Sequence, residues 1–478
     1  MTARVARLCD DIAPLLDADG RDSAAAVRDG LAEPLRLAVV GRVKAGKSTL
    51  VNALVGRRIA PTGVGECTRT VTWYRYGAPE RAELELRDGS RRDLPLRGGR
   101  MPDQLGVPPE RVARIVVHLQ AAALREQTVI DTPGLATLTS ENEDATRAAV
   151  LGADAAPDDA EQVSRYAAGQ AEAVLFVFRE SERKDELEFL DQFRAATGEL
   201  GASAINAVGV LSQADQFAGT DPFDVADGQA TRLAVARAAH VSAVVAASGL
   251  LAEAARTGRL SESDARLLAG IADLSEQRLR LRHSLPLPGG TDPAELERLY
   301  RVLGVHGLHQ GRHRCGGGVH QLVQWLESVS GIARVEDLVR SRLLSRAHAL
   351  KAMRALRVLT HAANRTGADT GAALGLIEQA RLDPALHPVR ELRALRSLVA
   401  EAPASPLRAE LERVSADTTD PARTGLPATA TPDDIAAAAR RCAAAAQTQA
   451  AFAMMPAEAE AGRVLARSYQ LIAQRVRP

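Results

Sequence analysis

Lysine and aromatic residues are scarce in this sequence. The 478-residue chain holds 60 basic residues, of which only Lys44, Lys47, Lys184 and Lys351 are lysine, so the other 56 are arginine. Aromatic residues make up 3% of the chain, which argues against stacking on single-stranded nucleic acid. The 60 basic and 60 acidic residues cancel, whereas nucleic-acid-binding domains carry a basic excess. We therefore expect no nucleic-acid partner.

Paired cysteines and long apolar runs are also missing. The four cysteines, Cys9, Cys67, Cys315 and Cys442, lie far apart and form no CxxC motif, which is typical of a reduced, cytoplasmic protein. No basic-then-apolar leader opens the sequence, and no uncharged apolar run reaches about 18 residues. We therefore expect a cytoplasmic protein without a membrane-spanning helix.

The hydrophobic pattern divides the chain into a mixed part and a helical part. From residue 35 to about 249, β-rich runs alternate with helical ones, which predicts a mainly parallel sheet with helices on both faces. The eight predicted strands are "LRLAVVG", "TVTWYRYG", "AELELRDG", "RIVVHLQ", "QTVIDTPG", "AVLFVF", "INAVGVLS" and "SAVVAASG". Residues 87–110 are rich in proline, glycine and arginine and predict a connection. After about residue 260 only helical patterns remain.

Helical spacing also marks both ends of the chain. Residues 4–16 place apolar side chains on one stripe and predict an amphipathic helix, followed by a glycine- and aspartate-rich break at 17–22. The alanine-rich segment 436–455 predicts a packed helix, with Met454 and Met455 in a helix-bundle core. Five potential zinc ligands crowd residues 306–320, but their spacing fits no zinc finger, so a glycine-rich loop is the favoured interpretation (His306, His309, His313, Cys315 and His320).

Residues 41–48, "GRVKAGKS", match the phosphate-binding pattern G-x-x-x-x-G-K-S between a predicted strand and a predicted helix. In such a loop, backbone N–H groups surround the β-phosphate and the helix N-terminus favours an anion. We expect Lys47 to reach the β- and γ-phosphates and Ser48 to bind Mg²⁺. The predicted nucleotide-binding residues of this loop are Gly41, Val43, Lys44, Ala45, Gly46, Lys47, Ser48 and Thr49.

A second phosphate-side motif, "VIDTPG", places Asp131 at the end of an apolar strand. An aspartate there can hold Mg²⁺ through water, and the N–H group of Gly134 can sense the γ-phosphate. A threonine between the two motifs is expected to bind Mg²⁺ and position the attacking water. Four threonines compete, of which spacing favours Thr68 and then Thr70 (Thr62, Thr68, Thr70 and Thr72).

The nucleobase is expected at "LSQAD", where Asp215 follows another apolar strand. A carboxylate accepts two hydrogen bonds from guanine and meets a lone pair in adenine, so it selects GTP over ATP. Typical GTPases have Asn/Thr-Lys-x-Asp here, whereas this chain has Ser212 and Gln213 before Ala214 and Asp215, so we expect looser binding. Ser248 and Gly249, after the next strand, are weaker candidates for the guanine carbonyl.

Together, "GRVKAGKSTLVNALVG", "APTGVGECTR", "VIDTPGL" and "VLSQAD" resemble the dynamin superfamily, and specifically bacterial dynamin-like GTPases of the actinobacterial isoniazid-inducible and sporulation group. The resemblance implies an α/β P-loop GTPase domain joined to an all-α neck and trunk bundle. Its implied parts are an N-terminal neck helix over residues 1–34, the GTPase domain over 35–330 and the neck and trunk over 331–478. The family's magnesium threonine falls on Thr68. An evident lipid-inserting hairpin is absent.

The second lysine of the phosphate loop needs its own explanation. Leu135 follows "DTPG" where small GTPases carry a water-orienting glutamine, so another group must supply catalytic polarity. Lys44 lies at the loop position where dynamin relatives place a charge-compensating element. Our hypothesis is that Lys44 neutralises the charge that develops as the γ-phosphoryl group leaves. The alternative is that Lys44 points to solvent or pairs with a partner subunit.

The combined prediction is a dynamin-like GTPase that uses Lys44, Lys47 and Thr68 in catalysis and binds GTP, GDP and Mg²⁺, the metal through Ser48, Thr68 and Asp131. The resemblance implies nucleotide-dependent association with a second copy or a sister dynamin-like protein. It also implies action at a membrane surface, peripherally at the inner face of the cell membrane. Two alternatives remain: a ribosome- or translation-associated GTPase, and a weakly catalytic GTP-binding scaffold.

Overall fold

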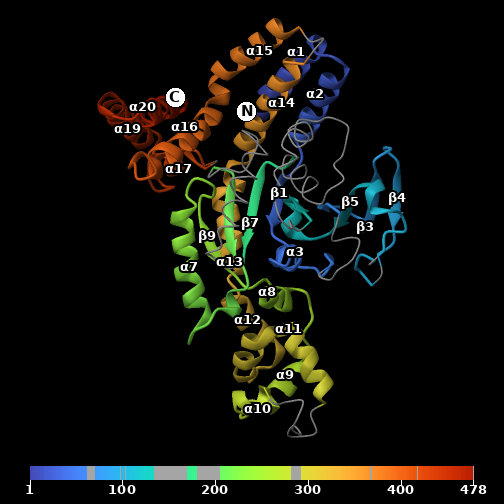
Figure 1. Ribbon diagram of the computed structural model, residues 1–478. Helices are drawn as coiled ribbons and strands as arrows, with labels where there is room; N and C mark the ends of the chain where they lie inside the picture. The colour runs from blue at the N-terminus through green and yellow to red at the C-terminus, as the bar shows by residue number, and fades with distance from the viewer. Residues whose placement is uncertain are drawn as a thin grey trace.

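The computed structural model describes residues 1–61, 70–96, 98–102, 104–133, 170–179, 205–280, 292–365, 369–416 and 418–476. A mixed sheet lies at the centre of the molecule (Figure 1). Helices from the two ends of the chain lie together at one end of it, and a second group of helices lies at the opposite end. The mainly parallel sheet combined with a large helical region confirms the predicted fold class.

The nine strands follow the order β4-β3-β5-β2-β6-β1-β7-β8-β9. β1 pairs in parallel with β6 and β7, β8 pairs in parallel with β7 and β9, and β2 pairs in parallel with β5. The β2–β6, β3–β5 and β3–β4 pairs are antiparallel. The strands are β1 Leu35–Gly41, β2 Thr72–Tyr76, β3 Arg81–Leu86, β4 Arg91–Leu94, β5 Val112–Leu119, β6 Gln127–Asp131, β7 Ala173–Phe178, β8 Ala207–Leu211 and β9 Val244–Ala246.

The central strands are apolar on both faces because both faces are covered. Along β1, Leu37 and Val39 belong to one hydrophobic core while Ala38 and Val40 belong to another. The first core includes residues of α3 (Lys47–Val55) and α13 (Ile332–Arg342), and the second includes residues of α7 (Pro222–Ala236). Such double burial produces near-continuous apolar runs in parallel sheets, which is why these strands were evident in the sequence.

All eight predicted strands are present, and one further strand was missed. The segment 87–110, predicted as a connection, contains β4. β4 pairs antiparallel with β3 at the edge of the sheet, with Leu94 opposite Ala82. Its sequence, "RRDL", buries only Leu94, so the alternation that identifies a strand is absent.

A helical lobe with its own core follows β9. It consists of α8 Gly249–Arg256, α9 Glu262–Gly270, α10 Glu276–Arg280, α11 Pro293–Gly311 and α12 Gly318–Val329. Its buried side chains include Leu251, Leu268 and Leu322. The histidine-rich segment predicted as a loop is mostly helical, because it forms the end of α11, a short 3-10 helix at Arg312–Arg314 and the start of α12. Within the described ranges, no group of potential ligands could hold a metal ion.

The N-terminal helices pack against helices from the second half of the chain. α1 (Thr2–Ile12) and α2 (Ala18–Gly30) share a core with α14 (Ala347–Ala363) and α15 (Thr370–Leu382). Val5, Leu8, Cys9 and Ile12 of α1 are buried there, as its apolar stripe predicts. The break predicted at 17–22 is wrong, because Asp17 accepts a hydrogen bond from the Gly20 N–H and thereby caps α2.

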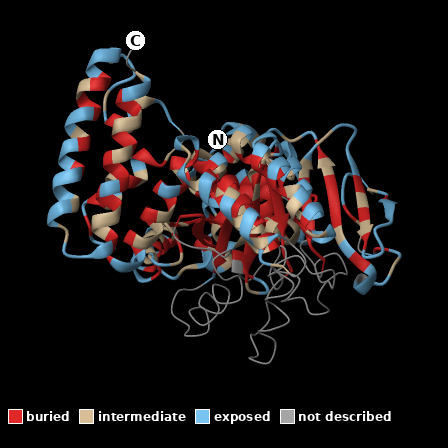
Figure 2. Cartoon of the chain, turned by 90° about the horizontal axis from the view of Figure 1, so that it is seen from above, coloured by how far each residue is buried: buried red, intermediate tan, exposed pale blue. Residues whose placement is uncertain are grey.

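The C-terminal helices form an arm beside the sheet (Figures 1 and 2). They are α16 His387–Glu401, α17 Leu407–Val414, α18 Asp420–Thr424, α19 Pro432–Phe452 and α20 Pro456–Arg475. α19 and α20 form an antiparallel hairpin, so segment 436–455 is largely helical as predicted. The prediction that Met454 and Met455 lie in a helix-bundle core is wrong, because Met454 is 96% exposed and Met455 is 39% exposed at the tip of the hairpin, beside Phe452 at 82%. No described helix is both long enough and apolar enough to cross a bilayer.

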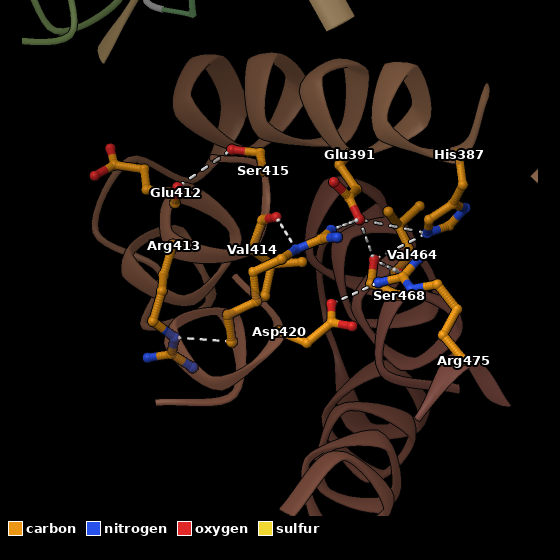
Figure 3. A network of polar contacts seen from close by, with 11 residues as sticks. His387, Glu391, Glu412, Arg413, Val414, Ser415, Asp420, Val464, Ser468 and Arg475 are labelled. Carbon is orange, nitrogen blue, oxygen red and sulfur yellow. Dashed lines mark hydrogen bonds and ion pairs between the residues drawn. The ribbon is translucent and has the colours of Figure 1, made fainter. Parts of the chain in front are cut away.

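A buried polar network joins three helices of this arm (Figure 3). Glu391 of α16 accepts hydrogen bonds from Arg423 (2.8 Å) and from the hydroxyl of Ser468 on α20 (2.7 Å). His387 Nε2 lies 2.9 Å from the same hydroxyl. Burial raises the pKa of Glu391, whereas burial, with nearby arginines, lowers the pKa of His387 to about 4. The histidine is therefore neutral at physiological pH.

Candidate functional site

The phosphate loop connects β1 to α3 at the carboxyl edge of the sheet. Gly46 has a φ of 89°, a left-handed conformation that glycine adopts without strain, and α3 begins at the next residue. Lys47 is buried, and its ammonium donates to the carbonyls of Gly41 (2.9 Å) and Arg42 (3.0 Å). Burial lowers the pKa of this ammonium, while Asp131 opposes that shift. The cation thus lies inside the loop, where the predicted phosphates would bind.

The structure brings two of the three predicted magnesium ligands together. The Ser48 hydroxyl donates to Asp131 Oδ2 at 2.9 Å. Asp131 Oδ1 is buried and makes no hydrogen bond to any described residue. Burial raises the pKa of Asp131 to about 6, although Lys47 and Ser48 lower it. A hydroxyl beside a buried carboxylate with an unused oxygen suits a hard cation such as Mg²⁺, so these residues fit the metal.

The other predicted phosphate-side residues are only partly described. Thr68, Gly134 and the competing Thr62 lie outside the described residues. Thr70 is buried just before β2, and Thr72 lies within β2, opposite Asp131 in the antiparallel register. In the loop itself, Val43 is 51% exposed and Lys44 is also exposed. The structure therefore leaves the choice among the four threonines as a prediction.

The predicted base-binding turn is bonded directly to the phosphate loop. The Ser212 hydroxyl lies 2.7 Å from the carbonyl oxygens of both Ala45 and Phe178. Gln213 Nε2 donates to the Lys44 carbonyl at 3.2 Å. Ser212 and Ala45 are 167 residues apart in the sequence. The two segments therefore meet at the same edge of the sheet. This is the edge at which α/β proteins bind nucleotides.

Asp215 is a mostly buried residue whose carboxylate accepts no hydrogen bond from a described residue. It lies in a 3-10 turn at Ala214–Gln216 and is 7% exposed. The kink of α11 lies against it: Gly304 has φ 67° and ψ −176°, and a Cβ built there would lie 3.4 Å from Asp215 Oδ2. A carboxylate that accepts no hydrogen bond from the described residues is free to accept donors from a ligand, which fits the predicted guanine contact.

The turn after β9 contributes less than its sequence indicates. The N–H of Ala247 donates to the Leu211 carbonyl at 2.9 Å, and the N–H of Ser248 donates to the Ser330 carbonyl at 2.8 Å. The Ser248 hydroxyl caps the first turn of α8 through the N–H of Leu251. Gly249 packs against α3, where a Cβ would lie 3.3 Å from the Leu50 nitrogen. Ser248 is thus already engaged, and a guanine contact by Gly249 stays a prediction.

Two neighbours of this site were not predicted from the sequence. Arg179 follows β7 directly, and its Nε donates to Gln213 Oε1 at 3.0 Å. Gly304 lies in a helix about 90 residues after Asp215 in the chain. Arg179 could have been found by the rule that functional side chains gather at the carboxyl ends of parallel strands. No signal in the sequence marks Gly304, because its kink interrupts a segment with an ordinary helical pattern.

Comparison with known proteins gives one family. Residues 37–199 match the model of the dynamin family. The chain is 36% identical over 304 residues to the isoniazid-induced protein IniC of Mycobacterium tuberculosis, a match that covers 60% of this chain and 58% of that protein. A shorter match, 43% identical over 54 residues, covers 11% of this chain and 8% of the bacterial dynamin-like protein of Nostoc punctiforme.

A solved structure of an oligomerised bacterial dynamin pair is also similar. It is 11% identical, with a TM-score of 0.35, and the match covers 99% of this chain and 90% of that one. At this low identity and TM-score, the similarity supports no conclusion about function. The chain spans less than two thirds of the length of IniC, so the activity of that whole protein does not transfer by similarity alone.

Proposed function

Since this chain carries a dynamin-family domain over residues 37–199 and is a homologue of bacterial dynamin-like proteins, we propose that it binds GTP and GDP with Mg²⁺ and hydrolyses GTP. The observation that carries this proposal is the pair formed by Ser48 and Asp131, with one carboxylate oxygen unused beside the phosphate loop. Lys47 would bind the β- and γ-phosphates and Thr68 would complete the metal site. Bound Mg²⁺ would supply charge neutralisation on the phosphates.

Guanine selection is assigned to Asp215. Its buried carboxylate would accept hydrogen bonds from the N1–H and the exocyclic amine of guanine. Calorimetric titration with GDP and ADP tests this assignment, and we expect binding of GDP alone. Asp215→Asn should lose GDP and gain xanthosine diphosphate, because the amide can donate to the additional xanthine carbonyl. Asp224→Asn, on the exposed side of α7, is the matched control. Equal affinity for GDP and ADP in the unmodified chain would contradict the proposal.

We further propose that the nucleotide cycle acts at a membrane surface, through the tip of the α19–α20 hairpin. Phe452 and Met454 are 82% and 96% exposed there, and Met455 is 39% exposed. Three apolar side chains on one turn, projecting at the end of two long helices, suit shallow insertion among lipid headgroups. The sequence alone favoured no such tip, because Met454 and Met455 were expected in a helix-bundle core.

Sedimentation with anionic liposomes tests the membrane contact. The double variant Phe452→Ser, Met454→Ser should reduce the bound fraction, whereas Leu382→Ser, which removes another side chain that is 77% exposed, should leave it unchanged. Sedimentation with ribosomes instead of liposomes would favour the translation-associated alternative. Phosphate release that stays absent at high protein concentration would favour the non-catalytic scaffold.

A further inference from the structure

Arg179 lies at the mouth of the candidate base site without an assigned task. It directly follows β7, is exposed, and donates its Nε to Gln213 Oε1 at 3.0 Å. This hydrogen bond leaves the two terminal amino groups of its guanidinium without a hydrogen bond or ion pair to any other described residue. An oriented cation that has no charge partner among the described residues can serve as a positioned ligand contact.

Two hydrogen bonds fix the side chain of Gln213. Its side-chain amide donates to the Lys44 carbonyl at 3.2 Å while its oxygen accepts from Arg179. Gln213 and Lys44 have φ values of 58° and 63°, and they are the non-glycine residues with positive φ in the described ranges. Such conformations cost energy and cluster where function requires a fixed geometry. The amide therefore presents a fixed acceptor that sets the position of the Arg179 guanidinium.

The segment around Asp215 lacks a cation that related sites possess. Typical GTPases have lysine at the position of Gln213, where its aliphatic stem packs on the base and its ammonium adds charge. A glutamine is neutral and shorter, so it lacks the charge and part of the aliphatic stem. Arg179, bonded to that same glutamine, brings both a stem and a charge to the position from a different strand.

We propose that Arg179 contacts the guanine nucleotide on the face of its base, in place of the missing lysine, with Gln213 orienting its guanidinium. This inference rests on the proposed GTP binding. A guanidinium is planar and weakly hydrated, so it stacks on an aromatic ring better than an ammonium does. Asp215 would read the edge of the guanine ring while Arg179 covers its face.

Nucleotide titrations on Arg179→Ala test the inference, with GTP, GDP and GMP as probes. We expect affinity to fall about tenfold for all three, the size of a base-stacking contact. Adding Gln213→Lys to Arg179→Ala should recover most of the loss, because lysine then occupies the usual position. Arg232→Ala, which removes an exposed arginine of α7, should leave the affinities unchanged.

The outcomes separate this inference from the proposed function. If unmodified protein binds GDP and Arg179→Ala binds it equally well, the inference is wrong while the GTPase proposal stands. A loss that grows with the number of phosphates would place Arg179 on the phosphate tail and overturn the base contact. Failure of Gln213→Lys to restore binding would show that the two positions are not equivalent. If the unmodified chain binds no guanine nucleotide, both proposals fall.

Discussion

At the scale of single residues, Lys44 has a strained backbone conformation and an exposed side chain. Its φ is 63°, and its carbonyl accepts the hydrogen bond from Gln213. Replacing the side chain leaves that backbone contact in place, so binding and catalysis can be separated. We predict that Lys44→Ala keeps its GDP affinity but slows single-turnover GTP hydrolysis by about 100-fold, the usual loss when one charge-stabilising group is removed. Lys44→Arg should stay close to the unmodified rate.

An unchanged single-turnover rate in Lys44→Ala would remove the catalytic role. Lys44 would then be a solvent-exposed or partner-binding lysine, which its exposure in the single chain also permits. A fall in both GDP affinity and hydrolysis would indicate instead that the substitution disturbs the loop that Gln213 supports.

Gly304 gives a second prediction at this scale. A methyl group there would lie 3.1 Å from Leu250 Cδ2 and 3.4 Å from Asp215 Oδ2. Gly258 also has a positive φ, 66° against 67°, but a Cβ there would meet nothing within 4 Å. We predict that Gly258→Ala and Gly304→Ala each lose about 1–3 kcal/mol of stability, because alanine is strained at these positive φ values. Only Gly304→Ala should also weaken GDP binding, measured by calorimetry.

Residues within local motifs were predictable, and residues brought in by the tertiary fold were not. Ser48 and Asp131 lie in short patterns whose spacing from strands places them at one edge of the sheet, and the structure has them 2.9 Å apart. Ser248 shows the limit of this reasoning, because its N–H is taken by Ser330, a residue outside any motif. Arg179 and Gly304 belong to no pattern, so only the assembled sheet and lobe reveal their position.

At the scale of helices and strands, the buried network of the C-terminal arm predicts a pH dependence. The pKa of His387 is lowered to about 4 in the fold, whereas an unfolded histidine titrates near 6.5. Between those values the unfolded chain binds a proton that the folded arm does not, so acidification removes stability, up to about 3 kcal/mol near pH 4. Glu391 acts in the opposite direction, because burial raises its pKa and protonation then favours the fold.

Scanning calorimetry between pH 7 and pH 4.5 checks this prediction. His387→Gln should flatten the acid branch, because the amide can still donate to Ser468 without titrating. His348→Gln, at an exposed position of α14, should keep the slope of the unmodified protein. If His387→Gln and the unmodified chain lose stability in parallel, the network does not control the acid response.

Whole helices and strands were predicted where the pattern of apolar residues runs along their full length. The eight strands with long apolar or alternating runs were found, while β4 was missed because only Leu94 of its four residues is buried. α2 was missed because its sequence, "ADGRDSAAAVRDG", contains residues that usually break helices, while the Asp17 cap and contacts with α14 stabilise it. Met454 was predicted to be buried but is exposed at the hairpin tip, because apolar character alone does not show which residues of a hairpin pack against other helices.

At the scale of the whole molecule, the described part of the phosphate loop has exposed side chains at the carboxyl edge of the sheet. Val43 is 51% exposed and Lys44 is exposed, so a second copy could contact the phosphate loop directly. We predict slow basal hydrolysis and a specific activity that rises with protein concentration, because association would order the segments that contact the γ-phosphate. Phosphate release across a concentration series measures this, with Lys47→Ala as the inactive control. A rate strictly proportional to enzyme concentration would contradict it.

Lys351, one of the four lysines, has a mechanical consequence for the whole chain. The backbone passes between the sheet and the outer helices from α2 to β1 and again from α13 to α14. Just after the second passage, the Lys351 ammonium donates to the carbonyls of Leu31 and Glu33 in the first. The Lys351 ammonium therefore ties the two passages to each other. Any movement of the outer helices that separated the two passages would have to break both hydrogen bonds.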